Sequence, residues 1–175
     1  MSTKMHFDTV HVTFSWDLEV DGSYERVDEQ VLGDQWDTYR SAILNPENVN
    51  GALAISGDGG EALVQDELWH IMSELCFAIP PLLSNGVSGT FKYLSWPGEV
   101  RLSVEGSLVR VSGGDVPDFT VPMKELVRGL VECGQRYQAL IGRVKDDPST
   151  YSGLWEMLSG LAPEANEALT RASQT

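Results

Sequence analysis

His70 is the histidine best placed for acid–base or metal chemistry in this chain. Glu67 lies three residues before it and Glu74 four residues after it, spacings that share one side of an α-helix. A di-iron helix bundle needs two Glu-x-x-His pairs and two further glutamates. The chain has the single pair formed by Glu67 and His70. We expect a solvated helix face without a metal, and an enzyme that uses His70 with Glu67 or Glu74 is the third-ranked hypothesis.

A glycine-rich turn, residues 56–60, lies between a short apolar run and a predicted helix, a place where phosphate-binding loops occur. The turn lacks the Gly-Lys-Ser/Thr of a P-loop, and Asp58 stands where an anion would bind. Asp58 and Glu61 match a capping box instead, in which two side chains satisfy free amides at a helix start. We therefore expect a capping turn and no nucleotide cofactor.

The two cysteines, Cys76 and Cys133, give no sign of nucleophilic catalysis. Neither belongs to a Cys-x-x-Cys motif or has a histidine nearby in the sequence. Both fall in predicted helices, where reduced and buried thiols are the usual state of an intracellular protein. No Gly-x-Ser-x-Gly elbow is present either. We expect a protein that is not an enzyme and that holds no cofactor.

A cluster of carboxylates near the N-terminus is the least ordinary chemical feature. Eight acids between residues 17 and 37 are opposed by Arg26 alone, and we expect them to bind a partner: Asp17, Glu19, Asp21, Glu25, Asp28, Glu29, Asp34 and Asp37. A solvated loop that only keeps the protein soluble is the alternative. Opposed potentials speed encounter and set specificity, so the cluster favours a basic protein partner such as a toxin or an enzyme.

The net charge of −14 is concentrated in the first half of the chain. Residues 1–75 have a balance of −12 and residues 76–175 a balance of −2. Like charges repel over a Debye length of about 8 Å, which disfavours direct binding to nucleic acid or to an anionic membrane. No apolar stretch reaches the roughly 20 residues of a membrane span, and the N-terminus lacks the apolar region of a signal peptide. We expect a cytoplasmic protein.

Residues 10–20 carry the clearest structural pattern. Six apolar residues alternate with polar ones, as in a strand with one buried face: Val10, Val12, Phe14, Trp16, Leu18 and Val20. The segment 21–23 supplies a turn, and residues 24–33 form either a second strand or a loop. A short helix is expected at 35–44, because the residue before Pro46 avoids helical geometry.

The rest of the chain alternates between helical and strand periodicity. After a brief strand at 52–55, apolar spacing predicts a long helix from Leu63 to Ile79 that Pro80 and Pro81 end or kink. Strands near 89–96, 100–104 and 108–111 predict an antiparallel meander closed by residues 113–117. A second long helix is expected at 122–144, where Gly134 would allow a neighbouring element to approach closely. Weaker helices are expected at 151–158 and 163–172, with a frayed end from about residue 173.

These elements predict a single α+β domain over residues 1–175. An antiparallel sheet, made of the N-terminal strand and the meander, would pack its apolar face against the two long helices. The sequence pattern leaves the order of the strands open. A pocket between the sheet and the helices would suit a small-molecule-binding or regulatory domain, which is the alternative to the basic protein partner.

The second half resembles small bacterial immunity-type proteins, which neutralise partner toxins. The likeness lies in Glu-Leu-Trp-His-Ile-Met-Ser-Glu-Leu-Cys-Phe at 67–77, the strand-turn-strand at 99–113, and the helix at 122–144 with Cys133-Gly134. The resemblance implies a non-enzymatic inhibitor of one partner, made in the cytoplasm. It is a likeness of arrangement, so it assigns no role to any residue. Together with the acid cluster, it predicts an immunity protein against a basic bacterial toxin.

Overall fold

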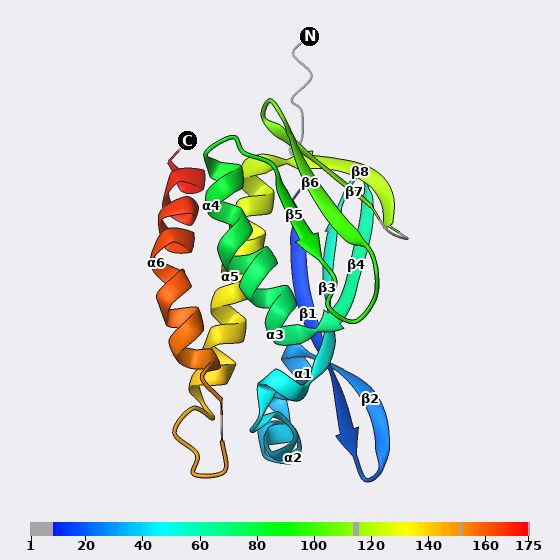
Figure 1. The fold of residues 1–175 in the computed structure, drawn as a ribbon, viewed down its shortest axis with the longest axis vertical. Helices are drawn as coiled ribbons and strands as arrows, with labels where there is room; N and C mark the ends of the chain where they lie inside the picture. Colours follow the sequence, from blue (N-terminus) through cyan, green and yellow to red (C-terminus); the bar gives the residue numbers. More distant parts are fainter. Residues whose placement is uncertain (1–8, 114–115, 151, 175) are drawn as a thin grey trace.

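Helices form one side of the molecule and two β-sheets form the other (Figure 1). The computed structural model describes residues 9–113, 116–150 and 152–174. It confirms the expected α+β class. The strands, which we expected in one sheet, are divided between two antiparallel four-stranded sheets. The reason is that the N-terminal strand pairs with its neighbours in sequence and leaves the meander to form a sheet of its own.

The first sheet has the strand order β2-β1-β3-β4, with β1 His11–Val20, β2 Ser23–Asp28, β3 Asn50–Gly57 and β4 Gly60–Glu67. β1 confirms the expected strand, with its apolar side chains buried from Val12 to Leu18. β3 pairs with the first half of β1 and β2 with the second half. The β1–β2 hairpin therefore extends past the rest of the sheet. Its turn residues Asp21 and Gly22 both have positive φ, as tight two-residue hairpin turns require.

Strand β4 replaces the first part of the predicted 63–79 helix. Its residues alternate between the interior and solvent, with Ala62, Val64 and Asp66 buried and Glu61, Leu63 and Gln65 exposed. The pattern escaped prediction because an aspartate takes an inner position and a leucine an outer one. The turn before β4 is part of a β-hairpin, so the expected capping box of Asp58 and Glu61 does not form.

The second sheet has the order β5-β6-β7-β8, with β5 Gly89–Lys92, β6 Glu99–Glu105, β7 Leu108–Gly113 and β8 Val116–Pro122. The expected closure of the meander at 113–117 is wrong in part, because Val116 and Pro117 already belong to a fourth strand; Gly114 and Asp115 lie outside the described residues. β8 is an edge strand, where a proline removes no needed donor. It meets the β3–β4 turn so closely that a Cβ on Gly60 would lie 3.0 Å from Phe119.

Three long helical segments cover the sheets. The first runs continuously through α3 (Leu68–Ile71), a π-helical segment (Met72–Ala78) and α4 (Ile79–Ser84), and the others are α5 (Met123–Gly142) and α6 (Leu154–Ser173). Pro80 and Pro81 do not end the first segment; they follow the π-helical segment directly, as the second and third residues of α4. α5 confirms the second long helix. α6 is one helix with Pro163 inside it, in place of two weaker helices, and Tyr151 lies outside the described residues.

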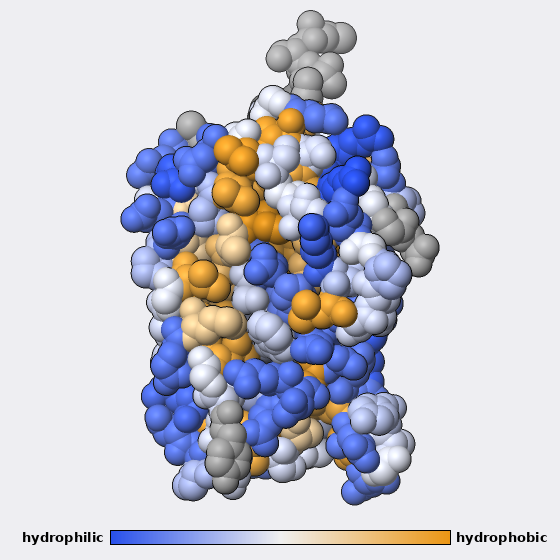
Figure 2. All heavy atoms as spheres, in the orientation of Figure 1, coloured by the Kyte–Doolittle hydropathy of each residue, from blue (hydrophilic) through white to orange (hydrophobic). Residues whose placement is uncertain are grey.

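Short helices link β2 to β3: α1 (Glu29–Asp34), α2 (Trp36–Tyr39) and two 3₁₀ turns, Arg40–Ile43 and Pro46–Asn48. They confirm the helix expected at 35–44 as two shorter pieces. On the face drawn in Figure 2, apolar side chains gather where the helices meet the second sheet. Two exposed apolar residues come from this part of the chain: Leu82 near the end of α4 and Val87 in the α4–β5 connection. Polar residues dominate the remaining edges of this view (Figure 2).

An aromatic cluster joins β1 to α5. The Trp16 ring stacks on Tyr137 with centroids 5.3 Å apart, and Phe14 stands edge-on to both rings. Gly134, one turn earlier on α5, admits the Phe77 ring, as its expected close-approach role requires. These contacts hold the inner face of β1 against α5. They therefore also fix the position of the β1–β2 hairpin, which continues from the same strand.

The hydroxyl of Tyr137 supplies a first test of this core. It is buried and has no hydrogen-bond partner within the described protein, and such a group costs about 1–3 kcal/mol. Tyr137→Phe should therefore leave the free energy of unfolding unchanged or raise it by about 1 kcal/mol, as measured by urea denaturation. Tyr39→Phe is the matched control and should lower the free energy of unfolding, because the Tyr39 hydroxyl bonds to Glu25. A clear loss in Tyr137→Phe would mean that its hydroxyl is paired.

Candidate functional site: an acidic pocket beside the hairpin

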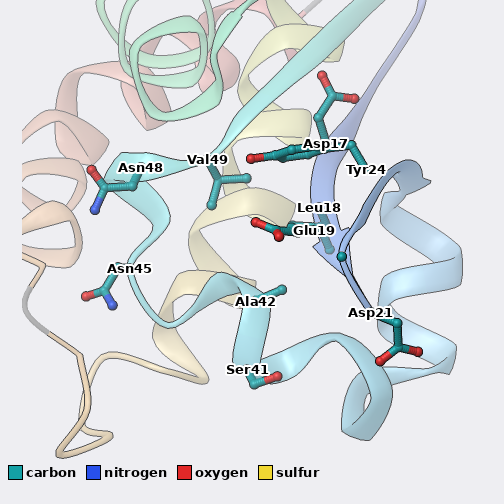
Figure 3. A pocket seen from close by; sticks show the side chains of 11 residues that line it. Asp17, Leu18, Glu19, Asp21, Tyr24, Ser41, Ala42, Asn45, Asn48 and Val49 are labelled. Atoms are coloured by element: carbon teal, nitrogen blue, oxygen red, sulfur yellow. The ribbon is translucent and has the colours of Figure 1, made fainter.

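A pocket of about 550 Å³ lies between the β1–β2 hairpin and the segment that leads into β3 (Figure 3). Its lining comes from two stretches of chain: Asp17, Leu18, Glu19, Asp21, Gly22 and Tyr24 from the hairpin, and Ser41, Ala42, Asn45, Asn48 and Val49 from the other side. Three of the eight expected partner-binding residues therefore meet at one concave surface. We call this surface the acidic pocket.

Strand register places the hairpin side chains on a common face. Asp17 lies opposite Arg26, and Glu19 lies opposite Tyr24. Figure 3 shows the Glu19 carboxylate and the Tyr24 hydroxyl pointing from the hairpin into the space in front of Val49. Side-chain alternation along the two strands thus presents an acid and an aromatic ring to the same space.

Asp17 is the one carboxylate of the pocket with an internal counter-charge. Arg26 donates two hydrogen bonds to Asp17, from Nε to Oδ1 at 2.7 Å and from Nη2 to Oδ2 at 2.9 Å. It also donates a hydrogen bond to Gln65 on β4 at 2.9 Å. The hydrogen bond to Asp17 is the main reason that the pKa of Arg26 rises, with partial burial acting the other way. Through Arg26, Asp17 therefore helps to hold the hairpin against the sheet, and its negative charge is largely neutralised.

Three other members of the expected set also have intramolecular partners. Asp28 caps α1 by accepting a hydrogen bond from the Val31 amide at 2.8 Å. Glu29 pairs with Arg136 of α5 at 2.7 Å. Glu25 accepts a hydrogen bond from the Tyr39 hydroxyl, which raises the pKa of that phenol. These carboxylates hold the hairpin and the short helices together.

The remaining four acids carry the uncompensated charge. Glu19, Asp21, Asp34 and Asp37 are exposed, and none forms an ion pair within residues 9–113, 116–150 and 152–174. Glu19 and Asp21 belong to the acidic pocket, while Asp34 ends α1 and Asp37 lies in the first turn of α2. The structure thus divides the eight acids into four with internal partners and four without an ion pair among the described residues.

Tyr24 is the pocket residue that sequence reasoning missed. Its side chain is 77% exposed, unusual for a tyrosine in a strand. The faces of aromatic rings attract ammonium and guanidinium groups, and a neighbouring carboxylate adds a hydrogen-bond acceptor. Asn45 and Asn48, which line the opposite wall, were missed as well. An aromatic residue within an otherwise polar strand, directly before Glu25, was the available signal.

His70 and Glu67 each have a hydrogen-bond partner other than one another. The Nε2 of His70 lies 2.8 Å from the Lys92 carbonyl oxygen, to which it donates, and the His70 ring packs against Phe91. Glu67 precedes the helix and accepts a hydrogen bond from the Trp69 indole at 2.7 Å. The expected helical Glu-x-x-His pair is therefore wrong, because β4 continues to Glu67 and sends that carboxylate to another partner.

The thiols of Cys76 and Cys133 are free and completely buried. Burial, followed by a hydrogen bond to Cys133, raises the pKa of the Cys76 thiol well above its ordinary value. A protonated thiol without access to solvent is a poor nucleophile. Among the described residues, no group of three histidine, cysteine or acidic side chains is arranged to hold a metal ion.

No described helix is long and apolar enough to cross a membrane. Comparison with known proteins found no matching family model, no matching curated protein and no matching solved structure.

Proposed function

We propose that the protein is a non-enzymatic binding protein that captures a basic protein partner through the acidic pocket and the neighbouring acids. The observation that carries this proposal is the meeting of uncompensated Glu19 and Asp21 with the exposed Tyr24 ring at one concave surface. An arginine or lysine side chain of a partner would meet a carboxylate, an aromatic face and two amides there.

The charge of the whole chain supports the same role. A net charge of −14 creates a field that attracts a basic protein, and such steering raises association rates by about 10 to 10³ at low salt. The four uncompensated acids lie in the hairpin turn, on β1 and on the short helices between β2 and β3. Steering would therefore deliver a partner to the same part of the molecule that holds the pocket.

A bacterial toxin that acts on nucleic acid is the partner class that we favour, since such a protein needs a basic site to hold phosphates. An acidic inhibitor that covers this site blocks the toxin without any chemistry of its own. In this proposal the protein works as a cytoplasmic immunity protein, as its resemblance to that class implies. The partner-facing residues are Glu19, Asp21, Asp34 and Asp37, with Tyr24 as the aromatic contact.

An arginine probe tests the pocket directly. In an NMR titration with a short arginine peptide, we expect shifts to centre on residues 17–24 and 41–49, because these line the pocket. Replacing Glu19, Asp21, Asp34 and Asp37 with their amides should weaken binding at least tenfold and flatten its salt dependence. The matched control neutralises four exposed acids elsewhere, Glu105, Glu132, Glu156 and Glu164. Equal losses in both variants, or shifts spread over all acids, would contradict the proposal.

A further inference from the structure

Arg143 is the exception among the arginines of this protein. Seven of the eight form ion pairs with carboxylates: Arg26, Arg40, Arg101, Arg110, Arg128, Arg136 and Arg171. Arg143 has no ion pair with any described residue, although the chain holds 26 acids. Its guanidinium carbon lies 3.7 Å from the centroid of the Trp36 ring. The guanidinium therefore lies over the indole, while its N–H groups have no carboxylate partner among the described residues.

The open guanidinium borders a second pocket, of about 390 Å³, which we call the arginine pocket. It lies between β1, α1 and α5 and is lined by Phe14, Glu29, Gln30, Arg136, Ala139, Leu140 and Arg143. Arg136 is matched there by Glu29, at 2.7 Å from Nε to Oε1. Arg143 is therefore the uncompensated charge of this pocket, and its sign is opposite to that of the molecule as a whole.

We propose that the arginine pocket binds a small amphipathic monocarboxylate. The carboxylate would accept two hydrogen bonds from the edge of Arg143, the geometry for which a guanidinium is best suited. The apolar body would lie on Phe14, Ala139 and Leu140. The volume falls within the range of about 300–1,000 Å³ typical of small-molecule sites. This function goes beyond capture of a basic partner, because it uses other residues and a ligand of opposite charge.

The stacking on Trp36 strengthens the case for a carboxylate ligand. A guanidinium held over an indole loses less side-chain freedom when it binds than a freely rotating one. Inorganic phosphate is also recognised by arginine, but it has no apolar portion to cover Ala139 and Leu140. The lining therefore favours a ligand that carries an apolar body beside its carboxylate.

A titration of the full chain with 3-phenylpropionate tests the ligand class. We expect saturable binding by calorimetry, with NMR shifts at the Trp36 indole and at the side chains of Ala139 and Leu140. Acetate and inorganic phosphate lack the apolar body, and 3-phenylpropanol lacks the charge, so each should bind at least tenfold more weakly. Failure of 3-phenylpropionate to saturate, or equal binding of the alcohol, would overturn the proposal.

Variants of exposed residues distinguish the contribution of the Arg143 charge to ligand binding from that of the apolar surface of the arginine pocket. Arg143→Gln should weaken binding of 3-phenylpropionate at least tenfold, and Arg143→Lys should restore part of it. Ala139→Phe should block the pocket while every charge stays in place. Arg110→Gln, which removes an exposed arginine from the second sheet, is the matched control and should bind like the native protein. Unchanged affinity in Arg143→Gln, with a native melting temperature, would also overturn the proposal.

Discussion

Replacing Trp16 with aspartate is expected to abolish the cooperative unfolding transition of this protein. Trp16 has no exposed surface and lies at the centre of the aromatic cluster that joins β1 to α5. The substitution removes the stacking on Tyr137 and the edge-on contact with Phe14, and it places a carboxylate among apolar side chains. No described base pairs with that position, so the new charge would be buried without compensation.

The expected loss is comparable with the whole stability of a domain. A tryptophan buries about 150–250 Å², which at about 25 cal/mol per Å² is roughly 4–6 kcal/mol. Burial of an unpaired carboxylate adds several kcal/mol more. Domains of this kind unfold with a free energy of about 5–15 kcal/mol. The variant should therefore populate unfolded or loosely packed states at room temperature.

Thermal denaturation followed by circular dichroism measures this loss, and near-ultraviolet signals report the packing of aromatic rings. Thr13→Asp is the matched control, because it adds the same charge to the exposed face of the same strand. That control should retain a cooperative transition within a few degrees of the native protein. If Trp16→Asp kept the native melting temperature, the inner face of β1 would be assigned wrongly.

Strand β1 was predictable because each of its inner residues is apolar and each outer one is polar. β4 was not, since its inner face includes Asp66 and its outer face includes Leu63, so the period of two is hidden. Helical spacing in the following segment then extended the predicted helix backwards by about one turn and a half. β8 was missed for a similar reason, because Pro117 and Pro122 make an edge strand look like a loop.

The acid cluster was predictable as a charge imbalance but not as a surface. Sequence alone could not show that Arg136, more than a hundred residues away, neutralises Glu29, or that Asp28 serves as a helix cap. The concave shape of the acidic pocket depends on the 41–49 segment, which carries no charge pattern. The same limit applies to Arg143. Its lack of a carboxylate partner cannot be known from the sequence, because it depends on which acids the fold places near each arginine.

Asp66→Ala should cause the second large loss of stability, by about 3–5 kcal/mol. Asp66 is 2% exposed and accepts hydrogen bonds from the Leu94 amide at 2.6 Å and the Ser95 hydroxyl at 2.5 Å. It ties β4 of the first sheet to the β5–β6 loop of the second. Hydrogen bonds to an ionised group are worth about 1.5–3 kcal/mol each, and alanine leaves both donors without this acceptor.

Urea denaturation measures the loss, and cleavage by chymotrypsin after Tyr93 or Leu94 reports release of the loop. Leu94 is already 54% exposed, so its protection from cleavage depends on the backbone being held in place. Glu61→Ala is the matched control, as it removes an exposed carboxylate from the same strand and should change stability by less than about 0.5 kcal/mol. A loss in Asp66→Ala no larger than in this control would show that the two sheets are held together without the carboxylate.

The pH dependence of Asp66 distinguishes its charge from its size. Burial acts to raise the pKa of this carboxyl, but the hydrogen bonds from Ser95 and from the Leu94, Glu67 and Ser95 amides outweigh it and hold the pKa below the ordinary 3.8. The ionised form therefore favours the folded state: its contribution is complete above the unfolded-state pKa and is lost as the pH falls through the lower folded-state pKa. Asp66→Asn keeps the size but cannot ionise, so its deficit relative to the native protein should be full at pH 7 and shrink below about pH 4. A deficit that stays constant from pH 7 to pH 2 would mean that packing, and not the charge of Asp66, holds the two sheets together.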